Sequence, residues 1–156
     1  MDITINLLSE ADRPLLLEML HSSSDYPDTA VGLYRRPSSR TKIFVAWSDG
    51  ELVGMLSGGF DSDLAQGGGF DSFDLPPPPQ AFLDRMHVHE DFREYGVGTR
   101  LLQAYVEEAI RRRCTFVGGQ LDLSSDPTQR RRYFEERGFT VRDLENFGAR
   151  PDELLV

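Results

Sequence analysis

The sequence predicts an α/β (α+β) fold in one domain that spans residues 1–156. Segments with strand-like patterning alternate with segments with helix-like patterning along the chain, without internal repeats. Near the middle, a turn containing Gly96 and Gly98 joins an apolar strand to an amphipathic helix. A length of 156 residues, with 39% apolar and 28% charged residues, suits a single soluble domain with a real core.

The first part of the chain predicts a strand, a helix and a β-hairpin. Apolar and polar residues alternate at 3–7, and the following helix has an apolar face made of Leu15, Leu16, Met19 and Leu20. Residues 43–47 and 52–60 are rich in β-forming side chains, and a Ser-Asp-Gly-Glu turn separates them. Residues 21–40 hold turn sequences near positions 27 and 37, with room for a short helix between them.

Residues 61–80 predict a flexible Gly/Pro-rich loop. Three consecutive glycines give this segment freedom, four consecutive prolines stiffen its far end, and the segment carries four aspartates. Two interpretations are open, a mobile surface excursion or an acidic lid over a cationic substrate.

The second half predicts a strand at 81–88, the glycine turn and a helix. That helix has an apolar face made of Leu101, Leu102, Tyr105, Val106, Ala109 and Ile110. A strand is expected at 116–124, and Asp126-Pro127-Thr128-Gln129 has the pattern of a capped helix start. A last strand begins at 139–141, and residues 153–156 are compatible with one more short strand.

The glycine turn predicts an anion site, because the first N–H groups of a helix lack partners and lie at the positive end of the dipole. A dinucleotide fingerprint is excluded, since Leu101 stands where it needs a third glycine or alanine. A P-loop is excluded because the only lysine, Lys42, lies far from the turn. The pattern that remains is R-x-x-G-x-G, from Arg93 to Gly98.

The composition indicates which classes of binding partner to expect. A net charge of −9 makes nucleic acid an unexpected partner and favours a cationic one, such as an amine. The arginine clusters at 111–113 and 130–132 are interpreted as solvated helix ends, although such clusters can also hold an anionic cofactor. A single cysteine, Cys114, is expected to be a buried structural thiol in a reducing compartment. Without a signal-like N-terminus or a membrane-length apolar stretch, we expect a cytoplasmic protein that does not bind membranes.

In this context, Arg93-Glu94-Tyr95-Gly96-Val97-Gly98 resembles the acyl-coenzyme-A pyrophosphate loop of the GNAT N-acetyltransferases. The sequence Tyr-Phe-Glu-Glu-Arg-Gly-Phe at 133–139 is similar to the family's usual ending, an aromatic-rich helix that closes in Gly-Phe. The order of predicted elements also matches the family. The resemblance implies a GNAT fold, with a single mixed, mostly antiparallel sheet of six to seven strands flanked by about four helices.

The resemblance further implies a site for acetyl-CoA, with no metal. The expected pyrophosphate cradle is Arg93, Glu94, Tyr95, Gly96, Val97, Gly98 and Thr99. Free backbone groups of Met86, His87 and Val88 would pair with the pantetheine arm. Ser124 or Ser125 would touch the cofactor at a position where family members often carry asparagine. The wall of the acceptor pocket is expected at Tyr26, Tyr34 and Arg35.

The implied reaction is direct attack of a primary amine on the thioester. In several family members the base lies two or four residues before the position of Met86, where this chain has Asp84 and Phe82. Asp84 is therefore the candidate base, and His87, expected on the opposite face of the strand, is its rival.

The family's usual acid is a tyrosine four residues before the Gly-Phe glycine. Phe134 stands there, so the neighbouring Tyr133 is the candidate acid. This departure leaves open a non-catalytic acyl-CoA-binding or regulatory module. A homodimer, common for such domains, is also compatible with the sequence.

Overall fold

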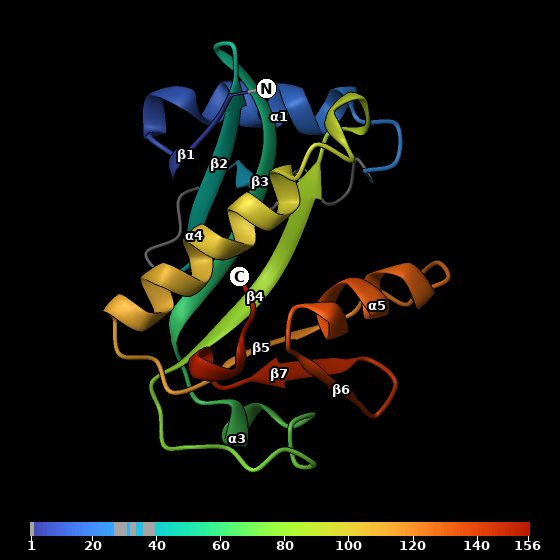
Figure 1. Cartoon of the computed structure of the whole chain (residues 1–156). Coiled ribbons are helices and arrows are strands. Elements are labelled where there is room, and N and C mark those ends of the chain that lie inside the picture. Colours follow the sequence, from blue (N-terminus) through green and yellow to red (C-terminus); the bar gives the residue numbers. More distant parts are fainter. Residues whose placement is uncertain (1, 27–30, 32–33, 36–39) are drawn as a thin grey trace. The chain divides into compact units, whose positions relative to one another are not determined.

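The structure is a computed structural model that describes residues 2–26, 31, 34–35 and 40–156 (Figure 1). Its strands form a seven-stranded sheet in the order β1-β2-β3-β4-β5-β7-β6. β1 pairs antiparallel with β2, and β7 pairs antiparallel with both β5 and β6, whereas β4 and β5 are parallel. The predicted mixed sheet flanked by helices is therefore confirmed.

The strands are β1 Ile3–Leu7, β2 Lys42–Ser48, β3 Glu51–Ser62, β4 Gln80–Val88, β5 Val117–Gln120, β6 Thr140–Arg142 and β7 Asn146–Ala149. The α-helices among the described residues are α1 Arg13–Ser22, α3 Leu64–Gly67, α4 Val97–Arg111 and α5 Thr128–Glu136. Short 3₁₀-helices occupy Glu10–Asp12, Glu90–Phe92 and Pro151–Glu153. The turn sequences predicted near positions 27 and 37 lie outside the described residues.

The chain forms two compact units, which we describe one at a time. The first contains residues 1–57 and 85–105, and the second contains residues 58–84 and 106–156. The core of the first unit consists of Leu16, Met19, Leu20, Tyr26, Val31, Tyr34, Val45, Leu52 and Met55. The prediction that Leu15 shares the apolar face of α1 was wrong, because it is 43% exposed. One step along a helix turns a side chain by about 100°, which carries Leu15 away from Leu16.

In the first unit, β3 and the start of α4 approach closely at Gly54. A Cβ at this glycine would lie 3.1 Å from Val97 Cγ1 and 3.3 Å from the Leu101 side chain. Leu101 is fully buried, as the apolar pattern of the helix predicts. Arg100 adds a hydrogen bond, in which its Nη2 donates to the carbonyl oxygen of Ile3 at 3.0 Å. These contacts fix the N-terminal end of α4 against the strands of this unit.

In the second unit, an aromatic cluster fills the space between α5 and the strand pair β5–β7. The rings of Phe134 and Phe147 are stacked with centroids 4.0 Å apart, and Phe139 meets Phe147 edge-on at 5.3 Å. Gly119 lies directly under this cluster, since a Cβ there would come within 2.3 Å of Phe147 Cζ. Ile110, predicted to be buried on α4, is instead exposed.

The segment 61–80, expected to be a loop, carries regular structure and buried side chains in the second unit. β3 continues to Ser62, and α3 follows at Leu64–Gly67. Leu64, Phe70 and Phe116 form a buried cluster against which Phe73, Leu75 and Phe82 pack. Buried Gln80 accepts from Leu64 N at 2.6 Å and donates to Pro76 O at 2.8 Å. Half of the aromatic side chains in this cluster come from the segment itself, which explains why it packs despite its glycines and prolines.

Several predicted boundaries were wrong. The strand expected at 116–124 is shorter, since β5 begins at Val117 and ends at Gln120. The short strand considered at 153–156 is absent, because Pro151–Glu153 forms a 3₁₀-helix. The terminal region instead contributes β7, which sequence patterning missed. The helix start predicted at Asp126 is shifted by one residue, because Pro127 is the N-cap of α5 and has no side-chain cap bond, although Asp126 Oδ1 still accepts from Thr128 N at 3.0 Å.

Candidate functional site

The glycine turn in the first unit has the backbone geometry that its sequence predicts. The 3₁₀-helix Glu90–Phe92 follows β4, and the backbone then passes through left-handed φ angles of +72° at Glu94 and +79° at Gly96 before α4 begins. A Cβ at Gly96 would meet nothing within 4 Å, so the space beside this residue is open. Tyr95 is 60% exposed and Val97 is buried. The turn therefore presents the first amides of a 15-residue helix at an open backbone position.

Arg93, the first residue of the motif, is held by two partners at the end of β4. Its Nε donates to the carbonyl oxygen of Val88 at 3.0 Å. Its Nη2 lies 2.6 Å from Asp25 Oδ2, and both side chains are partly exposed, at 42% and 47%. The guanidinium is thus engaged by the strand that precedes the turn and by the segment that follows α1.

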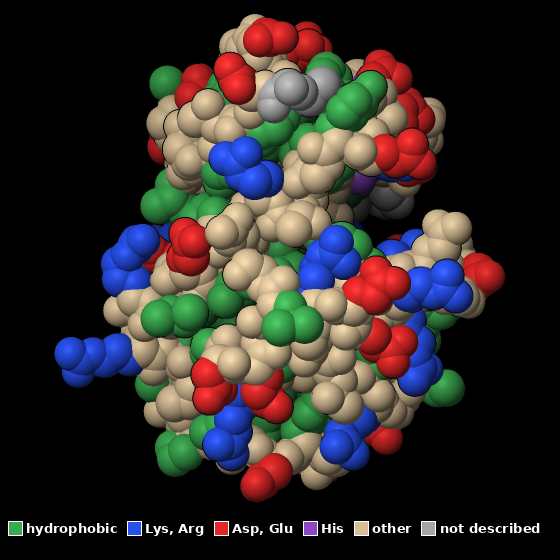
Figure 2. Space-filling view, in the orientation of Figure 1, with side chains coloured by type: hydrophobic (Ala, Val, Ile, Leu, Met, Phe, Trp, Pro, Cys, Tyr) green, Lys and Arg blue, Asp and Glu red, His purple; other side chains and the backbone are tan. Residues whose placement is uncertain are grey.

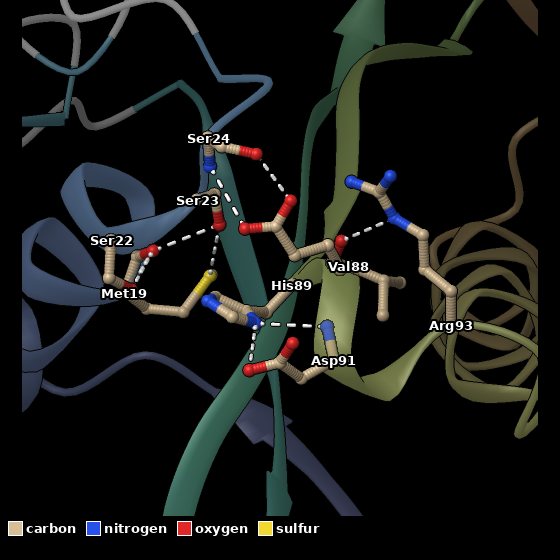
Figure 3. Close-up of polar contacts among 9 residues, drawn as sticks. Met19, Ser22, Ser23, Ser24, Val88, His89, Asp91 and Arg93 are labelled. Carbon is tan, nitrogen blue, oxygen red and sulfur yellow. Dashed lines mark hydrogen bonds and ion pairs between the residues drawn. The ribbon is translucent and has the colours of Figure 1, made fainter.

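The segment that follows α1 contacts the region around the turn through three consecutive residues, of which Figure 3 draws Ser24. Ser24 N donates to Glu90 Oε1 at 3.2 Å, and the Ser24 hydroxyl bonds to the second carboxylate oxygen. These two bonds hold the pKa of the exposed Glu90 carboxyl below its usual value. Asp25 pairs with Arg93, as above, and Tyr26 packs edge-on against His87 with ring centroids 4.9 Å apart. We call Ser24, Asp25 and Tyr26 the clasp.

His87, near the end of β4, sits in a desolvated environment. Burial lowers its pKa from 6.5 to about 4, while the nearby Asp25 carboxylate opposes the shift and Arg93 adds to it. Its Nε2 is buried and has no hydrogen-bond partner among the residues that the structure describes. The imidazole is therefore neutral near pH 7.

The other predicted cofactor residues of β4 lie at the end of the strand. Met86 and Val88 are half-buried. Just beyond them, His89 N donates to Val53 O at 2.9 Å, which extends the contact of β4 with β3 past the strand end. His89 also accepts from Asp91 N through Nδ1 at 3.2 Å. Gly98 and Thr99 follow in the first turn of α4.

Three predicted site residues, Asp84, Tyr133 and Ser124, belong to the second unit. Asp84 is exposed on β4. Tyr133 is half-buried in α5, with the Arg137 guanidinium 3.6 Å above its ring centre. Ser124 is exposed, and its N–H donates to Asp122 Oδ1 at 2.9 Å. The roles of these three residues stay predictions.

The residues expected to line the acceptor pocket have different environments in the first unit. Tyr34 is buried, and its hydroxyl lies 3.0 Å from Ser57 Oγ in a buried hydrogen bond. Its carbonyl oxygen accepts from Arg13 Nη1 at 2.5 Å. Tyr26 is buried beside His87, and Arg35 is exposed. Positions 27–30, 32–33 and 36–39 of the same region lie outside the described residues.

Sequence reasoning missed Ser24, Asp25 and Glu90. Their contacts join positions that are 66 residues apart in the case of Ser24 and Glu90. No local pattern marks a Ser-Asp pair after a helix as the partner of a distant turn. Among the described residues, the structure shows no cluster of three or more metal-ligating side chains and no helix long and apolar enough to cross a membrane.

Comparison with known structures shows three N-acetyltransferases of the same fold. The PaiA N-acetyltransferase of Thermoplasma acidophilum, solved with coenzyme A, matches at 15% identity over 96% of this chain and 99% of that chain, with a TM-score of 0.69. The aminoglycoside N-acetyltransferase AAC(6')-Iy, solved with a bisubstrate analogue of coenzyme A, matches at 19% identity over 90% and 92%, with a TM-score of 0.69. The ribosomal-protein-S18-alanine N-acetyltransferase of Escherichia coli matches at 16% identity over 94% and 90%, with a TM-score of 0.66.

No curated protein sequence matches the chain. The family model for the acetyltransferase (GNAT) family matches residues 7–139, a range that includes β4, the glycine turn, α4 and α5. The resemblance noted in the sequence is therefore confirmed. The chain belongs to the GNAT acetyltransferase family.

Proposed function

We propose that the protein is an acetyl-CoA-dependent N-acetyltransferase that moves an acetyl group to a primary amine, either a small cationic amine or a protein amine. The observation that carries this proposal is the glycine turn at the start of α4. Gly96 at φ +79° leaves open space where a side chain would stand, so a phosphate can approach the amides closely. The residues present therefore fit a pyrophosphate.

In this proposal, the amides from Arg93 to Thr99 hold the pyrophosphate, and the backbone of Met86, His87 and Val88 holds the pantetheine arm. Bound acetyl-CoA supplies an activated thioester. A backbone N–H near Met86 or Val88 stabilises the oxyanion that develops at the carbonyl, because a fixed dipole costs no reorganisation during the reaction. Ser124 is proposed to contact the cofactor as well.

An alkylamine reaches the site as an ammonium ion with a pKa of about 10.4, so the chain must provide a route for its proton. We propose Asp84 as the base, acting directly or through water. His87 is the alternative, and its neutral state near pH 7, its packing against Tyr26 and the absence of a described partner for Nε2 support it. Asp84→Asn and His87→Gln distinguish these candidates, because only the true base changes the acidic limb of the kcat/KM profile.

We propose Tyr133 as the group that protonates the departing thiolate. If so, Tyr133→Phe lowers turnover while acetyl-CoA affinity and folding are retained. Unchanged turnover would reject this role and indicate that coenzyme A leaves as the thiolate, which its acidic thiol permits.

The charge of the chain supports a cationic acceptor. The net charge is −9, and on the face shown in Figure 2 acidic side chains are interspersed with basic ones. The relatives act on different amines, an aminoglycoside in one case and the alanine of a ribosomal protein in another. An aminoglycoside and a peptide with N-terminal alanine are therefore the first acceptors to test. A cytoplasmic single-domain protein that binds neither a metal nor nucleic acid remains our expectation, as does a homodimer.

A non-catalytic acyl-CoA-binding or regulatory module is the second candidate function. The observation in its favour is that Phe134 occupies the position of the family's usual tyrosine and is buried in the aromatic cluster. Release of coenzyme A on addition of an amine would exclude this alternative.

Thermal unfolding with and without acetyl-CoA, with NAD as the control ligand, tests the proposed site. A ligand at 100 times its Kd stabilises the folded state by about 2.7 kcal/mol, which a melt resolves. We expect stabilisation by acetyl-CoA alone. No shift with acetyl-CoA would overturn the proposal and leave the glycine turn as a structural helix start.

A further inference from the structure

We propose that Asp25 competes with the cofactor's pyrophosphate for Arg93, so that binding of acetyl-CoA breaks the Asp25–Arg93 pair. This inference rests on the proposed function. It makes Asp25 a positioning residue, which acts through Arg93 and sets the affinity for the cofactor.

The first step of the argument is the placement of Arg93. Its Nε donates to Val88 O at 3.0 Å (Figure 3), and its Nη2 lies 2.6 Å from Asp25 Oδ2. The guanidinium therefore covers a backbone acceptor at the end of β4, the stretch proposed to pair with the pantetheine arm. The same side chain is the one cation of the motif from Arg93 to Gly98. In this arrangement, two parts of the proposed cofactor site are already engaged by protein groups.

The second step is the chemistry of the two competing anions. A guanidinium binds carboxylates and phosphates with the same donor geometry, so Asp25 occupies Nη2 as a phosphate oxygen would. The Asp25–Arg93 pair is partly exposed on both sides, and such pairs contribute little stability. A pyrophosphate carries more negative charge and also meets the amides at the start of α4. The pyrophosphate therefore binds Arg93 more strongly than Asp25 does. An Asp25 carboxylate that stayed beside the pyrophosphate would repel it.

The third step is the connection to the rest of the clasp. Ser24 and Tyr26, on either side of Asp25, contact Glu90 and His87. Exchange of Asp25 for a phosphate at Arg93 removes the central contact of three. The freed Asp25 carboxylate then lies next to His87. Burial disfavours a positive charge at this place, whereas the Asp25 carboxylate favours one. A cationic amine would thus meet a more negative site after acetyl-CoA has bound.

The experiment measures the Kd of acetyl-CoA by calorimetry on the full chain. The variants are Asp25→Asn, which keeps the size and removes the charge, Arg93→Gln, and the double variant. Because an exposed ion pair contributes up to about 1 kcal/mol, we expect Asp25→Asn to lower the Kd about two- to five-fold. Arg93→Gln should raise the Kd, and Asp25→Asn should have no effect in the Arg93→Gln background. Asp25→Ser, which also removes the charge, should lower the Kd by a similar factor to Asp25→Asn.

Ser24→Ala is the matched control. It removes the neighbouring hydroxyl bond to Glu90 and leaves the Asp25–Arg93 pair intact, so it should leave the Kd unchanged. An equal gain in Ser24→Ala would show that loosening the segment, and not the charge at Arg93, is responsible, which would overturn the inference. Unchanged or weaker binding in both Asp25 variants would also overturn it, with the proposed function intact if the native chain binds acetyl-CoA. Absence of binding in the native chain would overturn both.

Discussion

Acidification should destabilise the first unit through His87, and His87→Gln should remove that sensitivity. Burial lowers the pKa of His87 from 6.5 to about 4. Between these values the unfolded chain binds a proton that the folded chain does not, so stability falls as the pH falls. With the full shift, the loss between about pH 7.5 and pH 5 would be about 2 kcal/mol, and partial solvent access to the imidazole reduces this to about 1 kcal/mol.

The assay is urea unfolding followed by the fluorescence of the single tryptophan, Trp47, which belongs to the same unit as His87. Its indole N–H donates to Asn6 Oδ1 at 2.9 Å, a contact that unfolding breaks. The quantity compared is the change in stability between the two pH values, so any direct cost of the substitution cancels. His21→Gln, at an exposed position on α1, is the control and should behave as the native chain does. Equal acid losses in the native chain and in His87→Gln would refute the reasoning.

Three further predictions concern other parts of the chain. Gly119→Ala should destabilise the second unit by about 1–3 kcal/mol in urea unfolding, because its Cβ would lie 2.3 Å from Phe147 Cζ, whereas Gly67→Ala, with open space around it, should not. Gly96→Ala should cost about 1 kcal/mol, since φ is +79° there, and should weaken acetyl-CoA binding measured by calorimetry; normal affinity would contradict our use of this turn. Cys114 should react with a thiol reagent only after unfolding, because burial raises its pKa, and rapid reaction in the native state would contradict this.

The glycine turn could be predicted because its signal is local. The residues from Arg93 to Gly98 dictate a left-handed backbone and a helix start within a few positions, and the apolar spacing of α4 follows directly. By contrast, Ser24 and Glu90 meet across 66 residues, and neither side chain departs from what an exposed loop would carry. Such a contact depends on how β4 and the end of α1 are packed, which no short pattern encodes.

β7 was missed for a physical reason of the same kind. Glycine is disfavoured in strands, so Asn-Phe-Gly-Ala at 146–149 gives a weak strand signal. The structure needs Gly148, because a Cβ there would lie 2.3 Å from Phe116 Cζ. Gly119 in β5 has the same relation to Phe147. Here the close packing of aromatic rings on the strands outweighs the low strand propensity of glycine. The glycines that permit this packing are the residues that weaken the strand pattern in the sequence.

The recognition of the acceptor amine also depends on residues that sequence patterns did not indicate. Of the three residues expected to line its pocket, Tyr34 has its hydroxyl in a buried bond with Ser57, and Arg35 carries a charge that repels an ammonium ion. Neither is suited to recognise a cationic amine, whereas Asp25 and Glu90 bring two carboxylates to the end of β4. In the native arrangement both are engaged, one with Arg93 and one with Ser24. If acetyl-CoA takes Arg93, the negative charge of Asp25 becomes available beside the strand, and recognition of the amine then depends on prior occupation by the donor.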